Sequence, residues 1–188
     1  MYTEQKFNLS KMEGISEKQI DIHLGLYAGY VKNVNALKIN IEELKKDPEA
    51  NVIAIAELSR RLSFEWNGMR MHEYYFETLG GDGKPEGVLK EKIENAFGNY
   101  ETWEKEFKRI GKLRGIGWAV LALDKKTNTL ENIWVNDHEL GHLAGASILI
   151  AMDVWEHAFL IDYLPSERGN YIDAFFNNLD WTKLSNRL

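Results

Sequence analysis

The residues best suited to chemistry lie in one short acidic and aromatic stretch, Met152-Asp153-Val154-Trp155-Glu156-His157-Ala158. A carboxylate and an imidazole four residues apart can face one metal ion, from a helix face or from the corner where a strand enters a loop. The alternative is an ordinary helix start, in which Asp153 caps the helix and His157 falls in its first turn. An isolated Asp-x-x-x-His pattern favours the helix start, so the rest of the chain has to decide.

Two further histidines could complete a metal site. His23 and His72 lie on the apolar faces of two predicted helices, which a short connection makes antiparallel neighbours. A single histidine on such a face is usually a hydrogen-bonded core residue. Together with Asp153 and His157, however, these residues form a candidate set of imidazoles and one carboxylate, which suits a first-row metal and leaves a position for solvent. The chain has no cysteine, so any metal here takes nitrogen and oxygen ligands.

A competing motif is His138-Glu139-Leu140-Gly141-His142, which matches the H-E-x-x-H signature of zinc proteases. The extended form of that signature needs a third histidine at position 148, which is isoleucine. The motif also requires a regular helix, and Gly141 and Gly145 interrupt it. A zinc protease through His138 and His142 is therefore the enzyme alternative, ranked behind a redox metal site.

The elements that must position these residues are helical at first and mixed afterwards. Apolar residues at three- and four-residue steps predict a helix that starts at a Ser16–Gln19 capping box and carries His23. A second helix is expected near 52–79 and carries His72. Further helices are expected at 89–97, 100–113, near 155–163 and at 170–178, and strands at 118–124, 130–135 and 149–153.

This order of elements predicts an α+β fold. An N-terminal helical hairpin is followed by an α/β subdomain with a small three-stranded antiparallel sheet. The glycine-rich cluster from Gly80 to Pro85 is the clearest boundary in the chain. We therefore predict subdomains at 1–83 and 84–188, with the metal site between them.

Composition and charge exclude several classes of function. The chain of 188 residues is long enough for one core, or for two small subdomains that share an interface. A net charge of −6 with scattered Lys and Arg argues against nucleic-acid binding. No apolar run approaches the roughly 20 residues of a membrane span. Because the N-terminal residues also lack the apolar core of a secretion signal, we expect a cytoplasmic protein.

The chain resembles the iron/manganese superoxide dismutases. The stretch Asp153–Ala158 matches that family's D-x-W-E-H-A signature, and Arg168–Phe176 follows its C-terminal pattern. Upstream, Arg114–Trp118 resembles the family's G-S-G-W strand entry, His72–Phe76 its second-helix motif, and Ser16–Asn33 its first helix. The resemblance covers nearly the whole chain in the right order, so it favours the metal site over the helix start.

The resemblance implies a metal site and an activity. It implies that His23, His72, Asp153 and His157 bind one Mn or Fe ion per subunit. It implies an enzyme that disproportionates superoxide to dioxygen and hydrogen peroxide by redox cycling of that ion. Zinc does not cycle between oxidation states, which separates this chemistry from that of a protease.

The resemblance also implies roles around the metal. Tyr30 corresponds to a tyrosine at the mouth of the substrate channel, and Arg168 to an arginine near its entrance. Trp118 and Trp155 correspond to aromatic walls of the metal pocket. Glu156 corresponds to a glutamate that crosses a homodimer interface to the partner's His157. The implied assembly is thus a homodimer, and whether two dimers pair into a tetramer is left open.

Two departures from the family pattern concern the surroundings of the metal. Gly68, four residues before His72, is typical of manganese-type members, whereas His138 stands where a glutamine is usual. We therefore predict that His138 is a hydrogen-bond donor near the metal-bound solvent and Tyr30. Because some iron-containing members carry histidine at this position, the pattern is compatible with manganese, iron or both.

A third departure concerns the expected dimer interface. The family's His and Tyr interface pair is absent, and Leu26 or Tyr27 and Leu160 stand in its place. A metal-binding relative with impaired catalysis is therefore a third alternative. His142 has no counterpart among the family's functional residues, and we expect it at the surface or in an interface.

Overall fold

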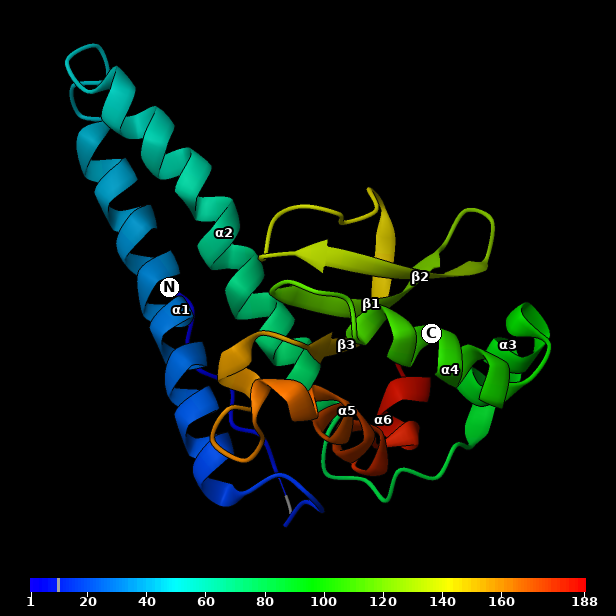
Figure 1. Cartoon of the computed structure of the whole chain (residues 1–188). Helices are drawn as coiled ribbons and strands as arrows, with labels where there is room; N and C mark the ends of the chain where they lie inside the picture. The colour runs from blue at the N-terminus through cyan, green and yellow to red at the C-terminus, as the bar shows by residue number, and fades with distance from the viewer. Residues whose placement is uncertain (10) are drawn as a thin grey trace.

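Two long antiparallel helices and a small sheet organise the molecule. This computed structural model describes residues 1–9 and 11–188. Helices α1 (Glu17–Leu44) and α2 (Val52–Glu77) form a hairpin whose tip extends away from the rest of the chain (Figure 1). The sheet contains β1 (Gly117–Asp124), β2 (Thr129–Asn136) and β3 (Ala146–Asp153), all antiparallel in the order β2-β1-β3. The predicted α+β fold is confirmed.

Shorter helices surround the sheet. Helices α3 and α4 lie at the end of the molecule away from the hairpin, and α5 and α6 lie on one side of the sheet (Figure 1). Their bounds are α3 (Gly87–Phe97), α4 (Tyr100–Gly111), α5 (Arg168–Asn177) and α6 (Trp181–Ser185), with two 3-10 helices, η1 (Glu156–Ala158) and η2 (Pro165–Glu167). The five-residue α6 was not predicted, because it is too short for a helical period to show.

Helix α1 begins where the capping pattern predicts. The Ser16 side chain accepts a hydrogen bond from the Gln19 backbone N at 3.0 Å, which satisfies one of the free N–H groups of the first turn. The second half of the predicted capping box is wrong, because the Ser16 backbone N donates to Asp162 Oδ2 instead, at 2.7 Å. The Gln19 side chain is therefore free to bind elsewhere. The buried face of the helix carries Ile20, His23, Tyr27, Val31 and Val34.

The sheet brings the end of β3 beside the start of β1. Trp118 pairs with Asp153 across the two strands, and β1 is almost wholly buried as the central strand. Just before Trp118, Gly117 has φ +150, and a Cβ there would collide with the Val135 carbonyl oxygen. Only glycine fits this close approach between β1 and β2. The strand pairing thus puts an indole next to the central carboxylate of the candidate site.

The helix predicted near 155–163 does not form. Only Glu156–Ala158 is helical, as the 3-10 helix η1, and the chain turns after it. A continuing α-helix would need the Ile161 N–H to bond the His157 carbonyl. Both groups are instead bonded to the Gln19 side chain, at 3.1 and 2.7 Å. A tertiary contact therefore overrides the local helical pattern.

The two halves of the chain are joined in several places. Leu79 and Leu179 form an isolated β-bridge, and the Asn178 side chain bonds the backbone N and O of Glu13 at 3.0 and 2.8 Å. The predicted boundary between residues 83 and 84 stays a prediction. Within the described part of the chain, no helix is both long enough and apolar enough to cross a bilayer.

Candidate metal centre

Four side chains from four elements of the fold meet at one point. His23 comes from α1, His72 from α2, Asp153 from the end of β3 and His157 from η1. One ligand atom from each lies within 4.8 Å of the others. His23, His72 and Asp153 are fully buried, whereas the His157 side chain is 22% exposed. The candidate set from the sequence is thus brought together, two members from residues 1–83 and two from 84–188.

The histidines converge on a single carboxylate oxygen. Asp153 Oδ2 lies 3.0 Å from His23 Nε2, 3.2 Å from His157 Nε2 and 3.7 Å from His72 Nε2. The other oxygen, Oδ1, accepts a hydrogen bond from the Trp155 backbone N at 2.8 Å, which holds the orientation of the carboxylate. Three ring nitrogens and one oxygen therefore face a common point.

The protonation of His72 fits a metal at that point. His72 Nδ1 lies 2.6 Å from the Gly68 carbonyl oxygen, and because a carbonyl only accepts, Nδ1 carries the hydrogen. Nε2 is then an unprotonated acceptor, and it is buried with no hydrogen-bond partner among the described residues. An unsatisfied buried acceptor is costly, and a cation would satisfy it. The donor set of imidazole and carboxylate suits Mn or Fe.

The electrostatics of the cluster favour a cation as well. Burial lowers the pKa of His23, and it lowers the pKa of His72 well below the usual value. Burial alone would raise the pKa of the Asp153 carboxyl, but His157 and His23 beside it hold that pKa well below its ordinary range. A neutral His23 and a neutral His72 beside a charged carboxylate are in the protonation states that metal ligands require.

A second group of side chains lies against the cluster. Trp118 Nε1 donates to His138 Nδ1 at 3.0 Å, and His138 Nε2 lies 2.7 Å from the Tyr30 hydroxyl. An indole N–H only donates, so Nδ1 of the neutral His138 carries no hydrogen and Nε2 carries one. His138 therefore donates to the Tyr30 oxygen, and the Tyr30 hydroxyl hydrogen is left for another acceptor.

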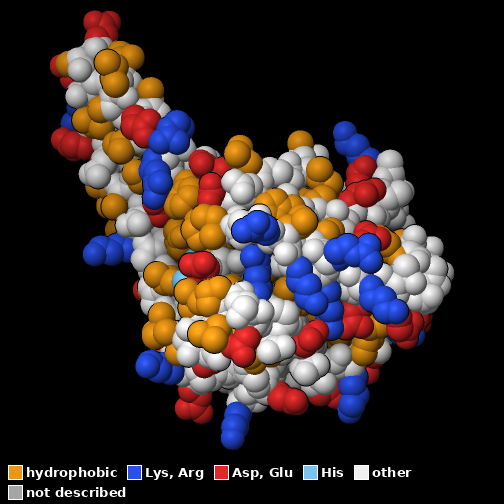
Figure 2. Space-filling view, viewed as in Figure 1, with side chains coloured by type: hydrophobic (Ala, Val, Ile, Leu, Met, Phe, Trp, Pro, Cys, Tyr) orange, Lys and Arg blue, Asp and Glu red, His pale blue; other side chains and the backbone are white. Residues whose placement is uncertain are grey.

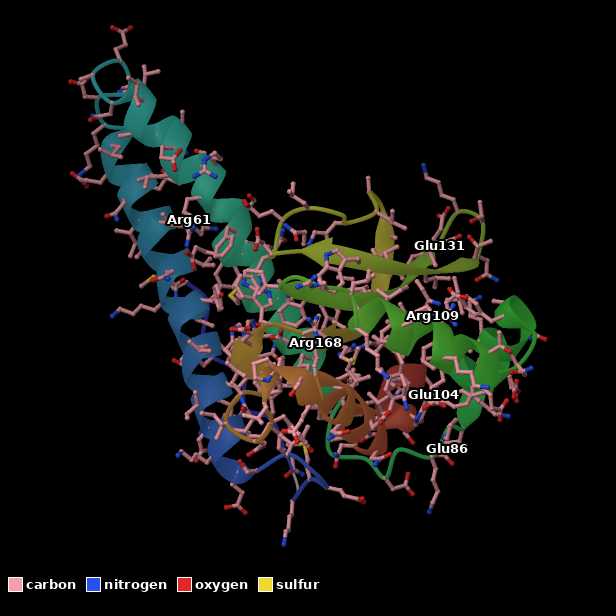
Figure 3. The ribbon with its side chains drawn as sticks, viewed as in Figure 1. Arg61, Glu86, Glu104, Arg109, Glu131 and Arg168 are labelled. Atoms are coloured by element: carbon pink, nitrogen blue, oxygen red, sulfur yellow. The ribbon has the colours of Figure 1, made fainter. Side chains whose placement is uncertain are left out.

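Aromatic rings and one arginine complete the surroundings. Trp155 stacks on His138 with ring centroids 4.9 Å apart, and Trp118 meets His72 edge-on at 5.2 Å. Arg168 lies at the start of α5 (Figure 3), where Nη1 donates to the Gly115 carbonyl oxygen at 3.1 Å. Its Nε and Nη2 are buried without a hydrogen-bond partner among the described residues. Glu156 is exposed.

The H-E-x-x-H motif does not form a zinc site. Residues 137–139 form a turn rather than a helix. Both ring nitrogens of His138 are engaged by Trp118 and Tyr30, and His142 Nε2 lies 3.0 Å from the His138 carbonyl oxygen. The two histidines therefore do not present nitrogens to a common ion. The geometry removes the structural basis of the protease alternative.

Gly68 leaves the space that the Tyr30 ring occupies. A Cβ at position 68 would lie 2.5 Å from Tyr30 Cδ1 and 2.6 Å from Cε1. We expect Gly68→Ala to displace this ring from His138 and to destabilise the protein by about 1–3 kcal/mol through overpacking. That loss should outweigh the roughly 1 kcal/mol by which alanine favours a helix over glycine. Denaturant unfolding measures the difference in free energy of unfolding between Gly68→Ala and the wild type.

Gly25 on α1 supplies the control for this substitution. A Cβ there meets no atom within 4 Å. Gly25→Ala should therefore stabilise the protein by up to about 1 kcal/mol. Equal free energies of unfolding for Gly68→Ala and Gly25→Ala would contradict the steric role of Gly68.

Acid should destabilise the metal-free protein. Burial lowers the pKa of His138 from 6.5 to about 4. The unfolded chain thus binds a proton that the native state excludes, so stability is full above about pH 6.5 and falls as the pH decreases towards 4. The lowered pKa of His138 should cost on the order of 3 kcal/mol of the free energy of unfolding as the pH falls. The lowered pKa values of His23 and His72 act in the same direction.

Denaturant unfolding of the metal-free protein between pH 4 and 7 measures this slope. His138→Gln should make the slope shallower by about one proton, because glutamine does not titrate. A slope unchanged by His138→Gln would assign the acid sensitivity to other groups.

The role of Gln19 in this region was not predicted from the sequence. Gln19 is 1% exposed and bonds the turn that carries His157. Its only signal in the sequence is its place three residues after Ser16, which indicates a capping box rather than a tertiary contact.

The fold and the site define a class: an α+β protein in which three imidazoles and one carboxylate, placed so that they could hold a metal ion, lie between a helical hairpin and a sheet. Comparison with known proteins makes the assignment more specific. The family model for iron/manganese superoxide dismutases, C-terminal domain, matches residues 85–187. A superoxide dismutase [Fe] of Cupriavidus metallidurans is 37% identical over 95% of this chain and 90% of its own length.

Archaeal relatives are similar over comparable lengths. A superoxide dismutase [Fe] of Pyrobaculum aerophilum is 34% identical, over 88% of this chain and 80% of its own. A superoxide dismutase [Mn] 2 of Haloferax volcanii is 35% identical over 89% of this chain and 83% of its own length. The chain belongs to the iron/manganese superoxide dismutase family, as the resemblance in its motifs predicts.

Proposed function

We propose that this protein is a superoxide dismutase that uses one Mn or Fe ion per subunit. The observation that carries the proposal is the convergence of three histidine nitrogens on one buried carboxylate oxygen. Relatives named for iron and relatives named for manganese both match the chain over most of its length. His23, His72, Asp153 and His157 would hold the ion.

The reaction needs two electron transfers of opposite direction. One superoxide gives up an electron and leaves as dioxygen, and a second gains an electron and two protons and leaves as hydrogen peroxide. A bound Mn or Fe ion supplies reversible one-electron transfer, which zinc does not. The chain has to supply charge compensation, a dry pocket and a hydrogen-bond donor.

Asp153 and Tyr30 meet two of these needs. The Asp153 carboxylate stays ionised and offsets part of the cationic charge. Burial raises the pKa of Tyr30 well above its usual value, so its hydroxyl keeps a hydrogen at neutral pH. Since His138 donates to the Tyr30 oxygen, we assign the donor that faces the substrate to the Tyr30 hydroxyl and the orientation of that hydroxyl to His138.

Three further residues receive supporting roles in the proposal. Trp118 and Trp155 exclude water from the imidazoles through their ring contacts with His72 and His138. Arg168 offers guanidinium N–H groups that have no partner within the described residues, which suits attraction of the superoxide anion. Its position near the channel entrance remains part of the proposal.

We propose a homodimer in which Glu156 reaches the partner's His157. Supporting it, the outer surface near His157 carries four exposed apolar side chains: Ile22 (42%), Leu26 (39%), Leu160 (42%) and Ile161 (43%). Figure 2 shows hydrophobic side chains grouped on this face, with a histidine surface visible among them. Glu156 itself is exposed within a single chain. Leu26 and Leu160 would replace the family's polar interface pair with an apolar contact.

Leu160→Asp is expected to weaken this dimer by at least tenfold, because it places a charge in an apolar contact. Sedimentation equilibrium measures the dissociation constant. The control is Val88→Asp on α3, where the side chain is 63% exposed and lies away from the proposed interface. A wild-type monomer, or equal dissociation constants for both variants, would contradict the proposal. A tetramer in the same experiment would indicate a second interface.

The function is tested by loading the metal-free protein separately with manganese, iron and zinc. We expect about one ion per chain and superoxide-dismuting activity with manganese, iron or both, and none with zinc. Zinc as the tightly held native metal, with peptide hydrolysis that is lost in His138→Ala, would overturn the proposal in favour of a protease. Metal binding without dismutation would support the impaired relative. The cytoplasmic location stays a prediction.

A further inference from the structure

We propose that Gln19 is a positioning residue for the metal ligand His157. This inference rests on the proposed function. The capping pattern in the sequence indicates for Gln19 only a role at the start of α1. Gln19 lies in the first turn of α1, one helical turn before His23, and is 1% exposed. Its side-chain Nε2 donates to the His157 carbonyl oxygen at 2.7 Å, and its Oε1 accepts from the Ile161 N at 3.1 Å.

These two bonds separate a donor from an acceptor that would otherwise bond each other. The His157 carbonyl and the Ile161 N–H are four residues apart, which is the spacing of an α-helical hydrogen bond. The Gln19 amide bonds both groups and so stands between them. The turn after η1 therefore lacks this α-helical bond and does not continue into an α-helix, although the Leu160 N still bonds the Glu156 carbonyl oxygen at 2.9 Å and both groups bonded by Gln19 have partners.

The open turn matters because of the side chain that it carries. His157 is the one candidate ligand outside a long helix or a strand, and its side chain is 22% exposed whereas the others are fully buried. Packing alone therefore restrains it less than it restrains His23 or His72. The Gln19 bond to the His157 carbonyl fixes the backbone directly at the ligand. The same helix thus carries one ligand and sets the backbone of another.

Two neighbouring hydrogen bonds also connect the start of α1 to the segment after η1, but they do not involve His157. The Ser16 N donates to Asp162 Oδ2 at 2.7 Å, and the Tyr163 hydroxyl donates to the Gly14 carbonyl oxygen. These bonds attach the segment after Ile161 to the start of α1. The His23 ring also packs against the His157 ring, with centroids 5.1 Å apart, but among the described residues the Gln19 amide makes the hydrogen bond from α1 to the backbone of His157, which is why we assign the positioning role to it.

Gln19→Leu tests the inference, because leucine is similar in size and can make neither bond. We expect Mn²⁺ to bind about 10- to 100-fold more weakly, as for other groups that orient metal ligands. Competition with a chelator of known affinity measures this constant. The visible absorption spectrum of the iron-loaded protein should also change, because it reports ligand geometry. Gln19→Glu keeps an acceptor for Ile161 but loses the donor to His157, so a loss of Mn²⁺ affinity comparable to that of Gln19→Leu is expected.

Asn178→Leu is the matched control. Asn178 is also a buried side-chain amide that joins two segments, through bonds to Glu13 and Ala174, and it lies away from the ligands. Asn178→Leu should lower the midpoint of thermal unfolding about as much as Gln19→Leu does. It should leave the Mn²⁺ affinity and the absorption spectrum of the iron-loaded protein unchanged. Equal Mn²⁺ affinities for wild type and both Gln19 variants would overturn the positioning role.

The two proposals fail in different ways. If Gln19→Leu does not fold, Gln19→Glu decides, and wild-type affinity in that variant contradicts the inference. If the wild-type protein itself binds neither manganese nor iron, the proposed function fails. If the wild type binds a metal and dismutes superoxide but the Gln19 variants match it, only the positioning role is lost.

Discussion

Replacing His157 with alanine is expected to lower the affinity for manganese or iron by more than 100-fold and to abolish superoxide dismutation. That loss exceeds the roughly 10- to 100-fold cost of changing groups that only orient ligands. His157 Nε2 lies 3.2 Å from Asp153 Oδ2, so alanine removes one nitrogen of the donor set and leaves a gap on the more exposed side of the site. Water entering there would compete with the remaining ligands.

Metal analysis of the purified variant, together with a dismutase assay, measures this effect. His142→Ala is the matched control, because His142 is also a partly buried imidazole and, among the described residues, its hydrogen bond is to the His138 carbonyl oxygen rather than to the ligand cluster. We expect His142→Ala to retain wild-type metal content. A His157→Ala protein that keeps one tightly bound ion would rule out His157 as a ligand.

His138→Ala is expected to have the second largest effect, and a different one. The variant should keep its metal, because His138 supplies no nitrogen to the ligand cluster, whereas activity should fall by about 10- to 100-fold. The reason is that Tyr30 loses the N–H that orients its hydroxyl, and Trp118 loses the acceptor of its indole N–H. A buried donor without a partner also costs about 1–3 kcal/mol of stability.

His138→Gln and Tyr30→Phe separate these contributions. A glutamine can accept from Trp118 through its carbonyl oxygen and donate to Tyr30 through its amide, so His138→Gln should recover much of the activity. Tyr30→Phe removes the hydroxyl and should reproduce the loss seen in His138→Ala. Activity measured per bound metal ion is the relevant quantity. Full activity in His138→Ala, or loss of its metal, would contradict the assigned role.

We expect the choice between manganese and iron to depend on the same small region. Gly68 leaves no room for a longer side chain, since even a Cβ would contact the Tyr30 ring. His138 offers one N–H where an amide would offer two. The hydrogen bonds around the metal therefore differ in number from those of a glutamine-containing site, and such bonds tune the redox potential of a bound ion. Dismutase activity after separate reconstitution with manganese and with iron measures this preference.

Much of the fold could be predicted from sequence because its patterns are local. Apolar residues every three or four positions show on which face of α1 and α2 the histidines lie, and this agrees with the buried faces of both helices. Apolar runs and polar turn residues predicted the sheet, with β3 starting three residues earlier than expected. The ligand set itself followed from a resemblance in motifs, since spacing alone left the helix start as an alternative.

Other features depend on contacts that no local pattern encodes. The tautomer of His138 is determined by the indole of Trp118, which is 20 residues away. The helical pattern after Trp155 predicted a helix, and the Gln19 amide, 138 residues before His157, prevents it from closing. In both cases a side chain from a distant element satisfies a buried polar group that local structure leaves open.

The sequence by itself therefore determined the α+β order of elements, the burial of His23 and His72, and the family to which the motifs point. Only the tertiary structure decided which nitrogen of His138 carries the hydrogen, how Gly68 and Tyr30 share space, and that Gln19 holds the turn of His157. The physical reason is that helices and strands form from neighbouring residues, whereas hydrogen bonds at a buried site join residues that only folding brings together.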